Sequence, residues 1–416
     1  MKKRILLIAL LVVLAAALAP AQKATLVLWH SYSGVRQQLF DSLIKEFNKA
    51  NPAINVKPEY GGSLWSMRDK LLTAIAGGAG PHLAEIDSYW TPIFAKPGSL
   101  VNLEPYIAAD ARFNKADLAR ASLQSTQYQG ASYSVPFNLS TIVMYYNKAL
   151  YKTAALDPAR APADWSELVS FCQKLTVDKN GDGTPDQRGL TFPNKANMGA
   201  VWYWLAFFFQ QEGKLFNDAL NAGAFNSAAG LAATDLWRQL AREGLMSMSS
   251  GSADFEAELA AMELSSSSVM GRYRDNMGNA RFGLAALPKG KVSATVTGGG
   301  NLAMFSSCPD KKAGWAVLSW LNSTQVNKRW ALSTGSIPVR QSVLGTPEYS
   351  DYLMSDPKGN AMIATLQDAF IRPNIPEYGD ASRIIAFAVE EAMINDQDPK
   401  PLLDKAKAEV DALFKK

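Results

Sequence analysis

The sequence predicts an α/β protein built from two lobes, and three observations support this fold class. Short β-rich runs alternate with amphipathic helical segments early in the chain, which is typical of a parallel α/β lobe. The pattern changes near residues 133–136, where a second lobe is expected to begin. The chain has 416 residues, of which 48% are hydrophobic, enough to fill the cores of two or three domains.

The first lobe begins with the β-rich run TLVLW, and apolar residues then recur at helical spacing until Asn51-Pro52 stops the helix. A glycine-rich break at 77–81 separates a second helix from the next strand. The expected elements are strand 25–29, helix 35–47, strand 54–56, helix 67–75 and strand 83–87. Ligands of such sheets bind beyond the carboxyl ends of the strands, which here are residues 29–32 and 87–90.

The second lobe opens with the run TIVMYY, which predicts a strand at 141–146. Later, three glycines at 298–300 precede a predicted strand at 302–305 and a helix at 313–321 that return to the pattern of the first lobe. Helical spacing resumes near the end of the chain, at 384–393 and 402–413.

Composition excludes several classes of protein. Lys2, Lys3 and Arg4 precede an apolar run that looks removable. Without them the chain has 39 basic and 38 acidic residues, so it lacks the excess positive charge of a nucleic-acid-binding protein. Two His and two Cys are too few for a zinc site built mainly from those residues. We expect Cys172 and Cys308 to be buried as small apolar side chains rather than paired.

Residues 1–21 have the three parts of a signal peptide: a basic start, an apolar stretch and Ala19-Pro20-Ala21 as a small-x-small cleavage site. The apolar stretch is shorter than the ~20 residues that span a bilayer. No Cys stands at the cleavage point, so no lipid anchor is expected. The mature protein is therefore expected in the periplasm or outside the cell.

Five segments, taken in order, resemble one family. They are LWHSYSG at 28–34, FNKANP at 47–52, GAGPHLAEID at 78–87, SVPFNLSTIVMYYNKALYKTAALDP at 134–158 and TGGGNLAMF at 297–305. Together they are similar to the family-1 extracellular solute-binding proteins of ABC importers, which bind sugars, and most similar to the glycerol-3-phosphate-binding branch. The resemblance runs from about residue 25 to the C-terminus.

The resemblance implies two α/β lobes joined by three hinge crossings near 132–137, 286–290 and 336–340, with a ligand cleft between the lobes. Lobe 1 would comprise 22–134 and 288–337, and lobe 2 would comprise 135–287 and 338–416. A monomer of this kind closes its hinge around a small molecule and delivers it to the membrane subunits of an ABC permease. The resemblance also implies that the protein is not an enzyme and requires no cofactor.

The candidate ligand-binding residues combine aromatic planes, which pack on the C–H faces of a sugar, with polar groups for its hydroxyls. Each candidate has an alternative role. The aromatic residues could instead pack in the core, Asp87 could cap a helix N-terminus, and His30 could form a cap or hinge hydrogen bond. The resemblance adds Gly299, whose backbone would approach the ligand. The full set is Trp29, His30, Tyr32, Trp65, Asp87, Trp90, Asn138, Ser140, Trp202, Tyr273, Gly299, Asn301, Arg372 and Tyr378.

The segment DKNGDGTPD places oxygen donors at alternate positions around a glycine turn, a spacing that suits a structural Ca²⁺. The expected ligands are Asp178, Asn180, Asp182, Thr184 and Asp186. Position twelve of the loop is Gly189 rather than the Glu of an EF-hand, and a solvated turn of Asx residues is the alternative.

Departures from the glycerol-3-phosphate branch favour a neutral carbohydrate as the ligand. That branch has a Tyr and an Arg where this chain has Ser336 and Ile385. A glycerol 3-phosphate or glycerophosphodiester binder is the first alternative. An exported glycosidase is the second, with Asp87 and Glu391 as the carboxylates, although nothing in the sequence places two carboxyl groups at hydrolytic spacing.

Overall fold

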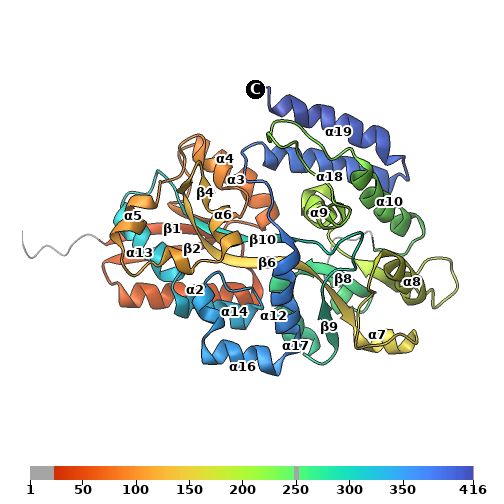
Figure 1. Ribbon diagram of the computed structural model, residues 1–416. Helices are drawn as coiled ribbons and strands as arrows, with labels where there is room; N and C mark the ends of the chain where they lie inside the picture. Colours follow the sequence, from red (N-terminus) through yellow and green to blue (C-terminus); the bar gives the residue numbers. More distant parts are fainter. Residues whose placement is uncertain (1–22, 248–252, 416) are drawn as a thin grey trace, which may run out of the picture.

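The computed structural model describes residues 23–247 and 253–415, and the signal-peptide prediction for 1–21 lies outside them. The chain forms an elongated molecule with two lobes, which share one continuous sheet (Figure 1). The strand order of that sheet is β2-β1-β3-β10-β6-β8-β7, with β9 and β11 pairing beside it. The predicted α/β class is confirmed.

Lobe 1 contains the predicted parallel unit, in which β1 pairs in parallel with both β2 and β3. Phe40, Leu43, Ile44 and Phe47 are the buried face of α2, which packs against β2. The elements of this lobe are β1 (Ala24–His30), α2 (Gly34–Ala50), β2 (Ile54–Tyr60), α3 (Leu64–Ala76), β3 (Leu83–Asp87), α4 (Thr91–Ala95), α5 (Glu104–Ala109), α6 (Arg120–Ser125), β4 (Gln127–Tyr128), β5 (Ala131–Ser132), α13 (Lys311–Leu321) and α14 (Thr324–Thr334).

Lobe 2 is built around α9, every residue of which is buried. The remaining helices and strands, apart from the two central strands, are α7 (Lys148–Thr153), α8 (Trp165–Leu175), β7 (Arg188–Thr191), α9 (Ala200–Gln210), α10 (Ala228–Arg242), α11 (Ala253–Glu256), β8 (Ala260–Ser266), α12 (Met270–Met277), β9 (Phe282–Ala285), α15 (Gln341–Leu344), α16 (Pro347–Ser355), α17 (Pro357–Ala364), β11 (Ala369–Phe370), α18 (Tyr378–Ile394) and α19 (Pro399–Leu413). Of these, α15 and α16 contact α14 of lobe 1. Helices α18 and α19 lie side by side at the outer edge of lobe 2 (Figure 1).

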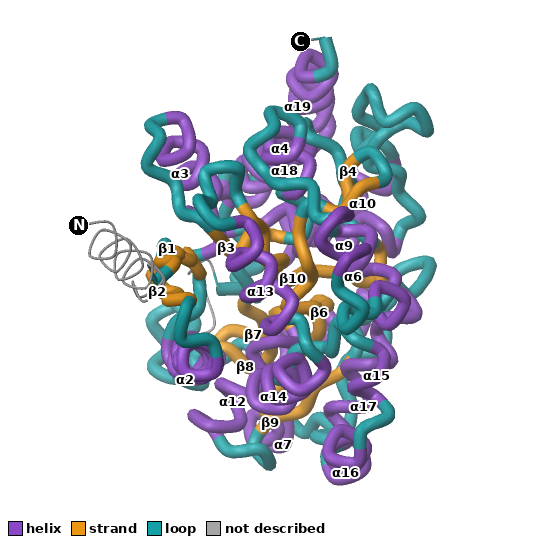
Figure 2. Tube along the Cα trace, turned by 90° about the vertical axis from the view of Figure 1, so that its left-hand side faces the viewer, coloured by secondary structure: helices purple, strands orange, loops and turns teal. Residues whose placement is uncertain are grey.

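Two long strands carry the chain between the lobes, and they lie next to each other at the centre of the molecule (Figure 2). They are β6 (Ser134–Asn147) and β10 (Thr295–Met304), which pair antiparallel. The second crossing therefore lies within β10 rather than at 286–290, because Ala294 and Val296 still pack in the core of lobe 2. The glycines at 298–300 are part of this strand, and do not precede it as the sequence suggested.

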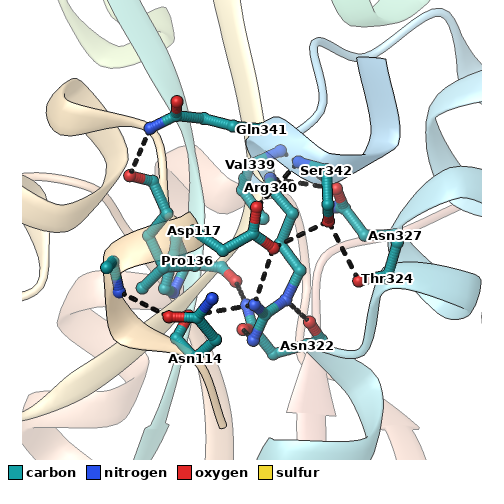
Figure 3. Close-up of polar contacts among 12 residues, drawn as sticks. Asn114, Asp117, Pro136, Asn322, Thr324, Asn327, Val339, Arg340, Gln341 and Ser342 are labelled. Carbon is teal, nitrogen blue, oxygen red and sulfur yellow. Dashed lines mark hydrogen bonds and ion pairs between the residues drawn. The ribbon is translucent and has the colours of Figure 1, made fainter. Parts of the chain in front are cut away.

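A buried arginine fastens the third crossing to lobe 1 (Figure 3). Arg340 is 4% exposed, and its guanidinium donates to the carbonyl of Asn114 (3.1 Å), to Asp117 (3.0 Å) and to the side chain of Asn322 (2.7 Å). Asn322 in turn donates to the carbonyl of Pro136 in the first crossing. One network thus joins the first and third crossings to the end of α13.

Cys172 and Cys308 are both free and buried, as expected. Within the described ranges no helix has the length and apolar character needed to span a membrane.

The Arg340 network predicts a large loss of stability when the cation is removed. Arg340→Met should lower the free energy of unfolding by about 3 to 5 kcal/mol, because several buried acceptors lose their donor at once. Arg329→Met is the matched control, since Arg329 pairs with Glu46 at the surface and should cost under about 1 kcal/mol. Urea unfolding of both variants measures the difference, and equal losses would contradict the anchoring role.

Glu263 in β8 predicts a pH effect. The residue is fully buried, and burial raises the pKa of its carboxyl to about 7, although Tyr273 donates a hydrogen bond to it. The folded chain therefore binds a proton that the unfolded chain releases, so stability falls as pH rises from about 4.5 to 7. The free energy of unfolding of Glu263→Gln, relative to that of the native chain, should increase by about 2 to 3 kcal/mol as the pH rises from 5 to 8. Urea unfolding at several pH values measures this difference.

Tyr273→Phe tests the sign of that effect. Removing the Tyr273 hydroxyl takes away a hydrogen bond that favours the ionised carboxylate, so the pKa of Glu263 should rise further. The fall in stability should then extend to higher pH. An unchanged pH profile in both variants would show that Glu263 keeps the same protonation state in the folded and unfolded chain.

Candidate functional site

A cleft of about 390 Å³ lies between the lobes, with the two central strands as its floor. Lobe 1 contributes the ends of β1 and β3 and the first turn of α3, while lobe 2 contributes α9, the end of β8 and α12. The lining residues are Ser31, Ser33, Arg36, Tyr60, Ser63, Leu64, Trp65, Glu85 and Asp87 from lobe 1, Asn138, Ser140, Gly298 and Gly299 from the central strands, and Pro193, Trp202, Tyr203, Ser265, Ser266, Ser268, Val269, Arg272 and Arg372 from lobe 2 and its connection.

A second cavity of about 550 Å³ continues from the cleft and shares Ser63, Trp65, Trp202 and Arg372 with it. Trp90 and Tyr378, both predicted ligand contacts, line this second cavity. Asn301 lines neither: its amide donates to the carbonyl of Ser125 (3.0 Å) beside a polar void of about 10 Å³, room for a single water.

Two tryptophans face each other from opposite lobes. Trp65 stands in the first turn of α3 and Trp202 in the first turn of α9, with ring centroids 6.5 Å apart and planes inclined by 48°. Gly199 allows this approach, because a Cβ there would lie 2.2 Å from the Trp65 ring. Both tryptophans line the cleft.

The three glycines of β10 make room for different parts of the site. A Cβ at Gly298 would lie 2.5 Å from the Trp202 ring, and one at Gly300 would lie 2.7 Å from the Glu85 carboxylate. Gly299 has a φ of +125°, and a Cβ there would lie 1.9 Å from the carbonyl of Asn138. Only glycine fits this backbone, which is why the cleft floor can bring lobe 1 and lobe 2 side chains together.

Asp87 lines the cleft as predicted, but its carboxylate is already paired. Arg372 forms a buried ion pair with it, and both side chains are 4% exposed. The same guanidinium donates to the Ser88 hydroxyl (2.7 Å) and lies 4.4 Å from the centre of the Tyr89 ring. Arg372 follows β11, 285 positions away in sequence, so the pair links the end of β3 to the segment between β11 and α18.

Glu85 is a site residue that the sequence analysis missed. It is 2% exposed, lines the cleft, and accepts hydrogen bonds at Oε2 from the backbone N–H and hydroxyl of Ser31, both at 2.7 Å. Burial raises the pKa of its carboxyl, and the Ser31 hydrogen bonds and the Arg36 charge oppose that rise. The sequence did indicate this residue. Residues two apart on a strand share a face, and Glu85 precedes Asp87 by two positions.

Besides Asn301, four predicted contacts line neither the cleft nor the second cavity, and the structure gives them other partners. The Trp29 indole donates to exposed Glu59 (3.1 Å), and its side chain packs against the core cluster that contains Met67 and Ile86. His30 and Tyr32 are buried in the core of lobe 1, with the His30 Nδ1 accepting from the Tyr32 N–H (3.2 Å). Tyr273 is fully buried in lobe 2, where it donates to Glu263.

The predicted calcium loop is an exposed turn held by its own backbone. The Asp178 carboxylate accepts from the N–H groups of Gly181 (2.7 Å) and Gly183 (2.8 Å), and Asp182 accepts from the N–H of Thr184 (2.7 Å). These are the contacts of Asx turns. No group of three or more acidic, His or Cys side chains converges on a metal position in the described ranges, this loop included.

Similar proteins share this architecture. The chain is 25% identical to the maltotriose-binding protein of Pyrococcus abyssi, over 94% of this chain and 80% of that protein. It is 26% identical to the sn-glycerol-3-phosphate-binding periplasmic protein of Salmonella typhimurium, over 82% of this chain and 80% of that protein. An ABC transporter solute-binding protein from Thermotoga lettingae, bound with α-D-tagatose, has the same fold at 24% identity and a TM-score of 0.85, covering 94% of this chain and 99% of that one.

A family model gives the assignment. The model of the bacterial extracellular solute-binding proteins matches residues 42–355, which is about three quarters of the chain. This range includes most of lobe 1, both central strands and the lobe 2 wall of the cleft. The chain belongs to the bacterial extracellular solute-binding protein family.

Proposed function

We propose that this protein captures a neutral carbohydrate in the cleft and delivers it to the permease of an ABC importer. The observation that carries this proposal is the pair Trp65 and Trp202, which present aromatic planes from opposite lobes of one polar cleft. Aromatic planes pack against the C–H faces of sugar rings, and the hydroxyls and carboxylates around them suit sugar hydroxyls. Hinge closure would bring the two planes onto the same ligand.

The charges of the cleft favour a neutral ligand. Three arginines line it, Arg36, Arg272 and Arg372. They are matched by three carboxylates, because Arg372 pairs with Asp87, Arg272 pairs with Glu256 at 2.8 Å, and Glu85 lies within electrostatic reach of Arg36. A phosphate dianion needs surplus positive charge or several aimed N–H donors, and this balance offers no surplus.

Glycerol 3-phosphate or a glycerophosphodiester is the second candidate. Two observations favour it: the 26% identical relative that binds glycerol 3-phosphate, and Arg36, which forms no ion pair with any described residue. A phosphate beside Arg36 would still face the carboxylate of Glu85. We therefore rank this candidate below the carbohydrate.

We further propose that the protein acts as an exported monomer. The family is extracellular, and the signal-peptide pattern of residues 1–21 supports export, with cleavage after Ala21. The relatives are binding proteins, which supports a non-catalytic role for this chain as well. Two lobes that close on a solute form a complete binding unit within one chain.

Isothermal calorimetry on residues 22–416 tests the ligand class. The panel contains D-tagatose, maltose, maltotriose and sn-glycerol 3-phosphate. We expect heat from at least one sugar, and we expect Trp65→Ala to weaken that binding by about 2 to 4 kcal/mol, the cost of removing a central aromatic contact. Trp29→Ala is the matched control, because its ring lies outside both cavities and its loss should leave the affinity unchanged.

Two outcomes would contradict the carbohydrate proposal. The first is tight binding of glycerol 3-phosphate with no heat from any sugar, which moves the second candidate into first place. The second is equal weakening by Trp65→Ala and Trp29→Ala, which would mean that the tryptophans act through stability rather than through contact with the ligand.

Calcium binding at residues 178–186 stays a proposal, supported by the alternation of oxygen donors in the sequence. The turn seen here would have to redirect its carboxylates to bind the ion. We expect millimolar Ca²⁺ to raise the melting temperature of the native chain, and Asp182→Asn to abolish that increase, because the ion binds the folded state. If the native chain has the same melting temperature in Ca²⁺ and in chelator, the proposed calcium site is contradicted.

A further inference from the structure

The two carboxylates of β3 have different surroundings although they share one face of the strand. Asp87 is neutralised by the buried guanidinium of Arg372, which also holds the Ser88 hydroxyl. Glu85 has no basic side chain within 4.0 Å among the described residues. Ser31 donates two hydrogen bonds to it, both at Oε2, and the Tyr32 hydroxyl also interacts with this carboxylate. Glu85 thus lines the cleft as a carboxylate that is paired with no cation among the described residues.

Arg36 stands on the same wall of the cleft. It belongs to the first turn of α2, is half-buried, and lies 5.7 Å from the centre of the Tyr32 ring. None of the described carboxylates forms an ion pair with it, and its charge acts on Glu85. Lobe 1 therefore presents an acceptor-only group and a donor-only group next to each other, both lining the cleft and neither committed to a partner of opposite charge.

A vicinal diol complements such a pair. Each sugar hydroxyl can donate one hydrogen bond and accept others, so one hydroxyl can donate to the carboxylate while its neighbour accepts from the guanidinium. Hydrogen bonds to charged groups are stronger than those between neutral groups. A ligand that lacked one of the hydroxyls would leave a buried charge unpaired, and such a site rejects the analogue strongly.

We propose that Glu85 and Arg36 select the ligand by binding two neighbouring hydroxyls of a sugar, and that the Asp87–Arg372 pair is a positioning pair that shapes the end of β3. This assignment rests on the proposed carbohydrate function. The proposal gives the two acidic residues of β3 different roles. Glu85, which is in no ion pair among the described residues, contacts the ligand. The proposal also explains the glycine at position 300, because a side chain there would displace the Glu85 carboxylate.

The experiment compares four variants by calorimetry and thermal unfolding: Glu85→Gln, Arg36→Met, Asp87→Asn and Glu59→Gln. The probe is the tightest-binding sugar among D-tagatose, maltose and maltotriose, together with its monodeoxy analogues. Glu85→Gln and Arg36→Met should each weaken binding 10- to 100-fold. Exposed Glu59 lies outside the cavities, and Glu59→Gln should leave the affinity within twofold of the native chain.

The deoxy analogues separate contact from structural support. One analogue should bind the native chain 10- to 100-fold more weakly than the parent sugar, and Glu85→Gln should then cause less than a twofold further loss. A second, adjacent analogue should show the same pattern with Arg36→Met. Asp87→Asn should instead lower the melting temperature of the unliganded protein more than Glu85→Gln does, because it leaves Arg372 buried without its counterion.

Each failure has a distinct meaning. If no sugar binds, the carbohydrate function and this assignment both fall. If a sugar binds but Glu85→Gln keeps native affinity, only this assignment is overturned. If Glu85→Gln weakens the parent sugar and every deoxy analogue by the same factor, Glu85 supports the fold of the cleft instead of contacting a hydroxyl, and the assignment is again overturned.

Discussion

The antiparallel pairing of β6 with β10 is the constraint on which the rest of the structure depends. Each strand begins in the core of one lobe and ends in the core of the other, so the lobes are two ends of one hydrogen-bonded pair. The sheet continues through the middle of the molecule, where residues of β6 and β10 line the cleft (Figure 1). The floor of the site and the connection between the lobes are therefore the same backbone.

Much of this fold could be predicted, because periodicity is a local property. The apolar spacing of α2 and the β-rich run of β1 need only a few neighbours to be recognised. Strand β10 was only partly predicted, since three consecutive glycines favour a turn when the strand partners are unknown. Here the pairing with β3 and β6 overrides that local preference.

The site was predicted less completely, because it depends on the directions and partners of side chains. The rule of strand ends pointed to Asp87, which lines the cleft, and also to His30 and Tyr32, which are buried and do not line it. The role of Arg372 depends on a residue 285 positions earlier, and no local pattern carries that information. Glu85 had a detectable signal in its register with Asp87, whereas the serines at the end of β8 had none.

The Arg340 network also sets where the molecule can bend. Arg340 and Asn322 tie two of the three crossings to lobe 1, so these segments move with that lobe as one body. The register shift of β10 against β6, between Gly300 and Asn301, lies directly beside this network, because Asn301 pairs with Pro136. Two of the three connections between the lobes are therefore held on the lobe 1 side of the molecule.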